Sequence, residues 1–347
     1  MSIYSGRVID NDESFQELIA RLSDFSGARN RCFLCGHSLE ARNYTYEHVV
    51  PAWAQRRHDL WNQKLTLLNE TGLFYRNLTV PCCNECNGTH LKPLEDILAE
   101  TVDVGVDAVR AIDRKLLFLW LGKIFYGILF KELQLLADRA DPAAGTILTA
   151  EEIDRYRMHR FFLQQARDRV RLLDFEPGSL FVFPMQDLPS RRMEWDLVDN
   201  IDTMFIGVRV GKVGFLAALA DGGAQQLYEQ HFDDIRDLPL HPLQFRELCA
   251  YVSYSSSLAN RTPKYVIMGG QRHSVFQMPL GGFSLKNLFE GWDSELYGHF
   301  LSFYTGLPFE QTFTPPNMNW TCIYNEQQQP RFLPFDEASI MPGDPMG

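Results

Sequence analysis

Four cysteines in two closely spaced pairs are the residues of this chain best suited to chemistry. Two residues separate Cys32 from Cys35 and Cys83 from Cys86, and residues 36–82 lie between the two pairs. Each pair can place two thiolates on one ion, and two pairs complete the tetrahedral shell of four sulfurs found in structural zinc sites. The sequence therefore predicts a structural Zn²⁺ site made of these four cysteines.

Two neighbouring residues are alternative ligands. Cys82 is separated from Cys86 by three residues, whereas Cys83 is separated by two, so we expect Cys83 to be the ligand and Cys82 a small buried neighbour. His37 could replace a thiolate, but we expect it to lie free beside the first pair. Five of the seven cysteines fall in this region, a distribution typical of metal ligands in a reducing compartment and not of a disulfide scaffold. We therefore predict a cytoplasmic protein.

The segment between the cysteine pairs carries residues that a four-cysteine zinc site does not itself require. Glu47 and His48 stand in a β-branched and aromatic run, residues 44–50, that ends at Pro51. Farther on, the sequence RNLTVP leads into the second cysteine pair, and Asn87 directly follows Cys86.

This order of elements resembles the HNH endonuclease superfamily, and the resemblance covers about 65 of the 347 residues. Many zinc-bearing members show C-x2-C, an acid-His pair followed by an apolar residue and Pro, then NL, then C-x2-C-N. The stretches EHVVP, RNLTVP and CNECN match that order. The resemblance implies a ββα-metal fold and hydrolysis of DNA phosphodiester bonds.

The resemblance also implies a role for each matched residue. His48 would be the general base that takes a proton from the attacking water, a task suited to an imidazole that titrates near neutrality. Glu47 and Asn87 would give oxygen ligands to one catalytic Mg²⁺ or Mn²⁺, which would polarise the phosphate and neutralise the leaving 3′ oxygen. Asn77 would brace the loop that keeps His48 aimed.

The sequence departs from the family pattern at two places. Glu47 stands where the zinc-bearing phage resolvases of the superfamily carry Asp, and its longer side chain would shift the cation. The segment formed by residues 52–75 is longer than the corresponding segment in the most compact members, and we interpret it as an insertion.

Each assignment has a structural alternative. His48 could be a core histidine bonded to a neighbour, and Asn87 could cap the helix that begins near it. The aromatic residues Trp53, Trp61 and Tyr75 are expected to pack in the core or in loops more than to stack on bases. Four basic residues are candidates for contacts with the nucleic-acid backbone, although exposed basic residues are usually solvated. They are Arg56, Arg57, Arg76 and Lys92.

The charge distribution agrees with a local nucleic-acid contact. The chain has a formal net charge of −11, which argues against a protein that coats nucleic acid by charge alone. Residues 28–92 contain eight Lys or Arg and five Asp or Glu, a local net charge of +3. Such a block can hold a phosphate backbone locally, and the resemblance to HNH endonucleases implies that the partner is DNA, with RNA left open.

The rest of the chain is interpreted from its apolar patterns. The most apolar run, residues 116–130, has fifteen residues with Lys123 near the middle, so we expect a buried helix and no membrane span. We expect helices at about residues 12–25, 94–139, 151–173 and 242–254, strands at 179–184, 203–210, 213–220 and 264–268, and an irregular Pro-rich tail beyond Leu307.

These elements predict an α+β protein with four regions. A small zinc-stabilised ββα-metal module comes first, followed by a larger helical and then mixed α/β part. The expected regions are an N-terminal helix (1–27), the HNH module (28–93), a helical region (94–175) and a mixed α/β region with a Pro-rich tail (176–347).

The prediction for function is a metal-dependent HNH endonuclease. We expect the C-terminal region to control where or when it cuts, as a sensor or a binding site for a regulatory protein of the kind carried by prokaryotic anti-phage or restriction effectors. Cutting both strands would also favour a homo-oligomer. The alternative is a zinc-stabilised module that binds nucleic acid or protein without cutting it.

Overall fold

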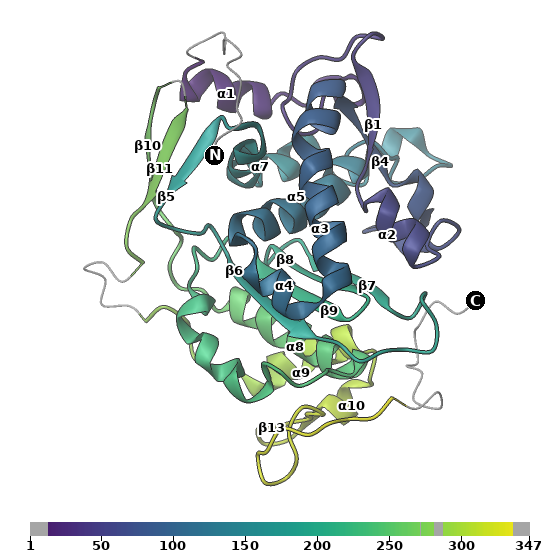
Figure 1. Ribbon diagram of the computed structural model, residues 1–347, viewed down its shortest axis with the longest axis vertical. Coiled ribbons are helices and arrows are strands. Elements are labelled where there is room, and N and C mark those ends of the chain that lie inside the picture. The colour runs from purple at the N-terminus through teal and green to yellow at the C-terminus, as the bar shows by residue number, and fades with distance from the viewer. Residues whose placement is uncertain (1–12, 271, 281–286, 336–347) are drawn as a thin grey trace.

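A long apolar helix, α5 (Arg114–Glu132), runs through the middle of the molecule (Figure 1). Nearly every residue from Leu117 to Phe130 is buried, as expected for a helix that is apolar on all sides. The computed structural model describes residues 13–270, 272–280 and 287–335. Within them the fold is α+β, which confirms the predicted class.

A four-stranded antiparallel sheet lies beside α5, in the order β6-β9-β8-β7. Its strands are β6 (Ser179–Pro184), β7 (Trp195–Asn200), β8 (Phe205–Val210) and β9 (Val213–Ala218). Strands β8 and β9 form the predicted hairpin, with Val210 paired to Val213 across the turn at Gly211 and Lys212.

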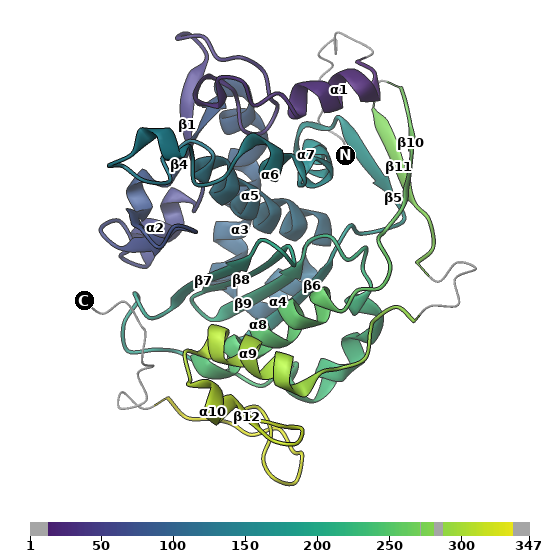
Figure 2. The same cartoon turned by 180° about the vertical axis from the view of Figure 1, so that it is seen from behind.

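The sheet separates two apolar clusters because successive side chains of a strand point to opposite faces. On one face Phe215 contacts Trp120 of α5, with 5.3 Å between the ring centroids. On the other face the sheet packs on α8 (Pro242–Ser257), which in turn packs on α9 (Ser294–Thr305). The large part of the chain is therefore a layered arrangement of α5, sheet and helices (Figures 1 and 2).

The predicted nuclease block contains an antiparallel pair of strands. β1 (Tyr44–His48) pairs antiparallel with β4 (Thr79–Cys83), so that Tyr44 lies opposite Cys83 and His48 lies opposite Thr79. The segment between them holds α2 (Ala52–Arg57) and a small hairpin. The remaining elements of this block are β2 (Lys64–Thr66), β3 (Gly72–Phe74), the one-turn helices η1 (Ala28–Asn30) and η2 (Tyr75–Asn77), the π-helical η3 (Glu85–Leu91) and α3 (Lys92–Val104).

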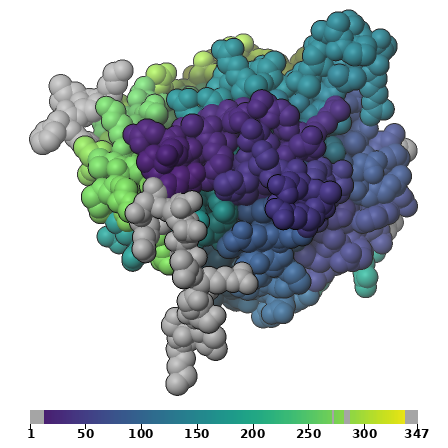
Figure 3. Space-filling model, turned by 90° about the horizontal axis from the view of Figure 1, so that it is seen from above, coloured from purple at the N-terminus to yellow at the C-terminus, as the bar shows by residue number. Residues whose placement is uncertain are grey.

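A third sheet joins distant parts of the chain. β5 (Val170–Leu173) pairs parallel with β11 (His273–Gln277), which pairs antiparallel with β10 (Tyr265–Met268). Helix α1 (Phe15–Leu22) packs on α7 (Arg157–Leu163) near these strands, and Figure 3 shows the purple N-terminal segment beside the green strands.

The other short elements connect these layers. They are α4 (Val106–Ala111), η4 (Pro142–Ala144), α6 (Ala150–Asp154), η5 (Gln164–Arg167), η6 (Gln225–Ile235), α10 (Phe309–Thr312), β12 (Phe313–Thr314) and β13 (Met318–Asn319).

Several sequence predictions need correction. The helix expected at 94–139 is three helices, because Gly105 has a φ of 123° and ends α3. The helix expected at 151–173 ends before β5, which starts at Val170 and is held by pairing with a strand a hundred residues away. The tail beyond Leu307 contains α10 and two short strands, whereas residues 336–347 lie outside the described residues, as does Asp12 at the expected start of α1.

The predicted module and the helical region share one apolar core. The same cluster of buried side chains includes Cys32, Val49 and Leu78 of the module and Phe125 and Phe161 of the helices. Among the described helices, none is long and apolar enough to cross a bilayer.

Candidate functional site

The four predicted zinc ligands come together in the structure. The Sγ atoms of Cys32, Cys35, Cys83 and Cys86 all lie within 4.8 Å of one another, and those of Cys35 and Cys83 are 3.9 Å apart. Four sulfurs at about 2.3 Å from one tetrahedral ion lie about 3.8 Å apart. These four cysteines can thus hold a zinc ion. In the described part of the chain, no other group of three or more His, Cys, Asp or Glu side chains brings its ligand atoms close enough together to hold a metal ion.

The neighbours of the cluster agree with the expected choice of ligands. Cys82 is fully buried with its Sγ 3.8 Å from that of Cys32, but it is not a member of the four-cysteine group. His37 is exposed and likewise lies outside the group. The first cysteine pair turns at Gly36, whose φ of 75° favours glycine. A Cβ atom there would lie 2.8 Å from the carbonyl oxygen of Arg21.

Side chains from the helical region hold the backbone of the first cysteine pair. The fully buried Arg160 of α7 donates to the carbonyl oxygens of Cys32 at 3.0 Å and Phe33 at 2.9 Å. Gln164 donates to the carbonyl oxygen of Leu34 at 2.8 Å. The geometry of the cysteine cluster therefore depends on residues more than 120 positions away, and the module is not held by its own residues alone.

Strand β1 presents different chemistry on its two faces. Glu47 is buried, whereas Tyr46 is 61% exposed and His48 is half-buried. Since alternate residues of a strand point the same way, Tyr46 and His48 share the outer face and Glu47 points inward. The predicted pair is thus adjacent in sequence but divided between two faces.

The inward carboxylate of Glu47 meets a buried lysine. Its Oε1 lies 2.5 Å from Nζ of Lys123, which is 1% exposed in the middle of α5. The same Nζ lies 2.6 Å from Oε1 of Glu95 on α3 and donates to the carbonyl oxygens of His48 at 2.7 Å and Val49 at 3.2 Å. One ammonium therefore joins two carboxylates and the end of β1.

These charges shift one another's pKa values. Burial raises the pKa of Glu47 to about 7, because the attraction of Lys123 does not outweigh the loss of water and the nearby charge of Glu95. The two carboxylates raise the pKa of Lys123 above its ordinary value despite its burial. The lysine stays charged, and Glu47 can exchange a proton near neutral pH.

Helix α5 presents one face to the β1–β4 pair. Lys123, Gly127 and Lys131 recur at four-residue spacing on it, and Nζ of Lys131 donates to the carbonyl oxygen of Thr79 at 3.0 Å. Gly127 lets the strand come close, because a Cβ atom there would lie 2.9 Å from the methyl carbons of Val49.

His48 is held by a glutamine of α2. Nε2 of the fully buried Gln55 donates to the carbonyl oxygen of Val50 at 2.8 Å and lies 3.3 Å from Nδ1 of His48. An amide nitrogen is only a donor, so in this arrangement Nδ1 accepts and the neutral ring carries its proton on Nε2. Burial and the positive charge of Lys123 hold the pKa of His48 below its ordinary value, so the ring is neutral at pH 7.

The two predicted asparagines lie in different surroundings. Asn87, in η3, donates through Nδ2 to the carbonyl oxygen of Tyr46 at 3.1 Å and to Oγ1 of Thr45 at 3.4 Å. Thr45 shares the inner face of β1 with Glu47, so the structure brings Asn87 to the face on which Glu47 lies. Asn77 is exposed, and within the described residues its side chain makes no hydrogen bond; its bracing role stays a prediction.

The comparisons with known proteins add no assignment. No protein-family model, no curated protein and no solved structure matches this chain.

Two of the four candidate phosphate contacts are engaged in ion pairs. Arg57 lies 2.8 Å from Asp103, and Lys92 lies 2.6 Å from Asp96 one helical turn away. Such exposed pairs are weak and can open for another anion.

The other two basic residues differ in their contacts. Arg76 donates to the carbonyl oxygen of Trp61 at 3.2 Å, and its guanidinium lies 4.2 Å from the ring centroid of Phe74. Arg56 is exposed and, in the described part of the chain, has no ion pair, hydrogen bond or ring contact. Arg76 thus holds the loop of Trp61, and Arg56 is the guanidinium left available to an anion.

Sequence reasoning did not assign Lys123, Glu95 or Gln55 to the site. A single lysine inside an apolar helix is a signal, since a buried ammonium requires an anionic partner. Nothing in the sequence marks Gln55 or Glu95, because their partners are decided by how α2 and α3 pack.

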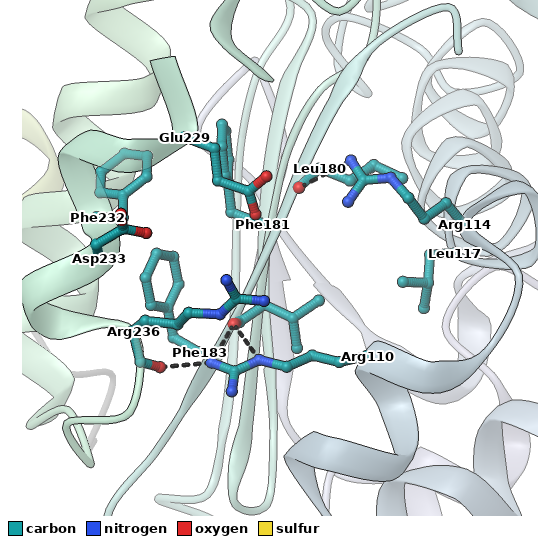
Figure 4. A pocket seen from close by; sticks show the side chains of 11 residues that line it. Arg110, Arg114, Leu117, Leu180, Phe181, Phe183, Glu229, Phe232, Asp233 and Arg236 are labelled. Atoms are coloured by element: carbon teal, nitrogen blue, oxygen red, sulfur yellow. Dashed lines mark hydrogen bonds between the residues drawn. The ribbon is translucent and has the colours of Figure 1, made fainter. Parts of the chain in front are cut away.

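A separate pocket lies between α4, the start of α5, the edge of β6 and η6 (Figure 4). It has a volume of about 100 Å³, below the 300 Å³ or more typical of small-molecule sites. Arg110 at its edge donates to the carbonyl oxygen of Val182 at 3.1 Å and pairs with Asp237 at 2.7 Å. Arg114 pairs with Glu176 at 2.7 Å. These arginines connect the helices to the sheet.

Proposed function

We propose that this chain is a metal-dependent phosphodiesterase that hydrolyses DNA, of the HNH type that its sequence resembles. The proposal depends on one observation: the four-cysteine cluster stands at one end of the β1–β4 pair, and the residues predicted for catalysis stand along β1 and in the helix that follows β4. Strand, strand and helix come in the order expected for a ββα-metal unit.

In the proposed reaction His48 takes the proton of the attacking water. Its depressed pKa supports this role, since a neutral ring is needed to accept a proton. Acceptance at Nε2 requires the tautomer with the proton on Nδ1, so the amide of Gln55 must yield its contact with Nδ1 during the reaction.

Glu47 and Asn87 would hold the divalent cation, which supplies charge neutralisation at the phosphate and at the leaving oxygen. Asn87 fits this role, because its side-chain Nδ2 donates to the carbonyl oxygen of Tyr46 in β1. Its side-chain Oδ1 is then the atom left to bind a cation. Glu47 fits in charge and lies on the face of β1 that Asn87 reaches, whereas His48 lies on the opposite face of the strand. The carboxylate of Glu47 is also bound to Lys123, so a cation there has to share it with, or displace, the ammonium.

The same ion pair favours a second candidate function. A glutamate neutralised by a buried lysine is a structural element if no cation competes for it, and the chain would then be a zinc-stabilised module that binds nucleic acid or protein without cutting.

The C-terminal region is proposed to control the reaction through α5. This helix contacts Glu47 through Lys123 and the four-stranded sheet through Trp120 and Phe215. A partner that shifts the sheet would act on the carboxylate through one rigid helix. The kind of partner, and a role in defence against phage, remain parts of the proposal.

The deciding experiment uses the full-length chain, because Arg160 and Gln164 hold the cysteine cluster from outside the module. Supercoiled, linear and single-stranded DNA, and RNA, are incubated with Mg²⁺, Mn²⁺ or chelator. His48→Ala is expected to lower cleavage about 10²- to 10⁴-fold with unchanged zinc content. His231→Ala, which removes an exposed histidine of η6, is the matched control. Absence of cleavage under every condition would overturn the proposed hydrolysis and leave the binding module as the remaining candidate.

A further inference from the structure

Exposed aromatic rings lie beside His48 at the outer face of β1. Tyr46 is 61% exposed and Trp61 is 44% exposed, although both are large enough to contribute strongly to a core. The centroid of the Trp61 ring lies 5.9 Å from that of His48, and the rings are tilted by 49°. Tyr46 and His48 are alternate residues of one strand, which places their side chains about 7 Å apart on the same face.

The backbone around these rings is fixed. Tyr46 contacts the ring of Tyr44 at 5.1 Å between centroids, and the hydroxyl of Tyr44 donates to the carbonyl oxygen of Arg29 at 3.1 Å. Arg76 holds the carbonyl oxygen of Trp61. Both ribbon views place β1 at the outer edge of the molecule, with α3 and α5 on its inner side (Figures 1 and 2). The rings therefore lie on a rigid and accessible surface.

One exposed cation completes this surface. Arg56 follows Gln55, which contacts His48, and its positive charge contributes to the lowered pKa of His48. It is the candidate phosphate contact without a partner among the described residues. Aromatic rings with an arginine beside them form the usual platform for unpaired bases and their phosphates.

We propose that Tyr46 and Trp61 stack on unpaired bases beside His48, with Arg56 on the backbone, so that the substrate is single-stranded or locally unpaired nucleic acid. This inference deepens the proposed function and rests on it for the location of the reaction. A duplex keeps its bases stacked on one another, and their faces are then closed to these rings. Stacking also suits a chain with a formal net charge of −11, because it does not require an extended basic surface.

Binding is measured with the full-length chain by fluorescence anisotropy, without added Mg²⁺ or Mn²⁺ so that the probes stay intact. The probes are fluorescein-labelled 15-nucleotide single strands of DNA and RNA and the matching DNA duplex. We expect tighter binding of both single strands than of the duplex. Tyr46→Ala and Trp61→Ala are each expected to weaken single-strand binding by about 5- to 150-fold. Arg56→Ala should weaken it and reduce its salt dependence by about one phosphate contact.

Two variants serve as matched controls. Tyr46→Phe keeps the ring and should bind within about twofold of the wild type. Phe303→Ala removes a ring that is 72% exposed on α9, and it too should leave binding unchanged. The four substituted residues are exposed: Tyr46, Arg56, Trp61 and Phe303. We therefore expect unchanged thermal unfolding, which is checked by circular dichroism.

The outcomes separate this inference from the proposed hydrolysis. Equal affinity for duplex and single strand, no measurable binding of the single strands, or wild-type binding by both alanine variants would overturn the stacking surface. Ring-dependent single-strand binding with no cleavage under any metal would leave the surface in place and remove the hydrolysis. Cleavage of duplex DNA that neither alanine substitution changes would keep the hydrolysis and remove the stacking surface.

Discussion

Replacing Lys123 with methionine tests the centre of the proposed site. The side chain is 1% exposed, and its Nζ contacts Glu47 at 2.5 Å, Glu95 at 2.6 Å and the carbonyl oxygen of His48 at 2.7 Å. Methionine has nearly the same volume, so the change removes the charge without opening a cavity. Removing one partner of a buried ion pair typically costs about 3–5 kcal/mol.

The stability of this variant depends on pH through the protonation of Glu47. Without the ammonium, its pKa in the folded state rises above its present value of about 7, and the carboxyl becomes protonated. Protonating a group whose ordinary pKa is 4.5 costs about 1.4 kcal/mol per pH unit above that value. In the wild type this penalty reaches about 3.5 kcal/mol near pH 7 and grows no further, whereas in the variant it reaches about 5 kcal/mol at pH 8; at pH 5.5 it is about 1.4 kcal/mol in both. The loss of stability relative to the wild type should therefore be about 1.4 kcal/mol larger at pH 8 than at pH 5.5.

The assay is urea unfolding followed by tryptophan fluorescence at both pH values. Lys115→Met removes an exposed lysine near the start of the same helix and should change the free energy of unfolding by no more than about 0.5 kcal/mol. Adding Glu47→Gln to Lys123→Met should recover part of the loss at pH 8, because the cost of protonating the buried carboxyl is then gone. A loss that is equal at the two pH values, or no larger than that of Lys115→Met, would refute the reasoning.

Three further predictions concern the metal, the base and the core. Cys83→Ser should release zinc, measured by a chelating dye, while Cys82→Ser should retain it; retention by both would exclude Cys83 as a ligand. The pH profile of kcat/KM should rise with a midpoint below 6.5 as His48 loses its proton, and a midpoint well above 6.5 would contradict its role as a base. Burial raises the pKa of Glu132 to about 7 from 4.5, so the folded state carries a penalty that is full above pH 7 and vanishes below 4.5. Glu132→Gln keeps the oxygen that accepts from the Leu68 amide and should raise stability at pH 8 by up to about 3 kcal/mol, with little change at pH 4.5; an equal effect at both values in urea unfolding would count against the buried charge.

The local pattern was a good guide where an element depends on its own residues. The turn at Gly211 and Lys212, the strands β6, β8 and β9, and the buried character of α5 all follow from apolar periodicity and glycine chemistry. The pattern failed for β5, because its strand form depends on pairing with β11 far along the chain. It also gave no sign that Arg160 holds the backbone of the first cysteine pair, because no spacing rule connects Arg160 to those carbonyl oxygens.

The sequence by itself determined the metal-site chemistry. Spacing within each cysteine pair is a local property, and two such pairs specify a four-sulfur cluster wherever the backbone brings them together. It also placed Glu47, His48 and Asn87 in an order that resembles a nuclease.

Only the tertiary structure decided what surrounds those residues. Burial of α5 against the β1–β4 pair set Lys123 on Glu47, and the alternation of β1 turned Tyr46 and His48 outward beside Trp61. The physical reason is that a side chain's environment is fixed by long-range packing. The free energy of a buried charge or of an exposed ring depends on neighbours that are distant in the chain.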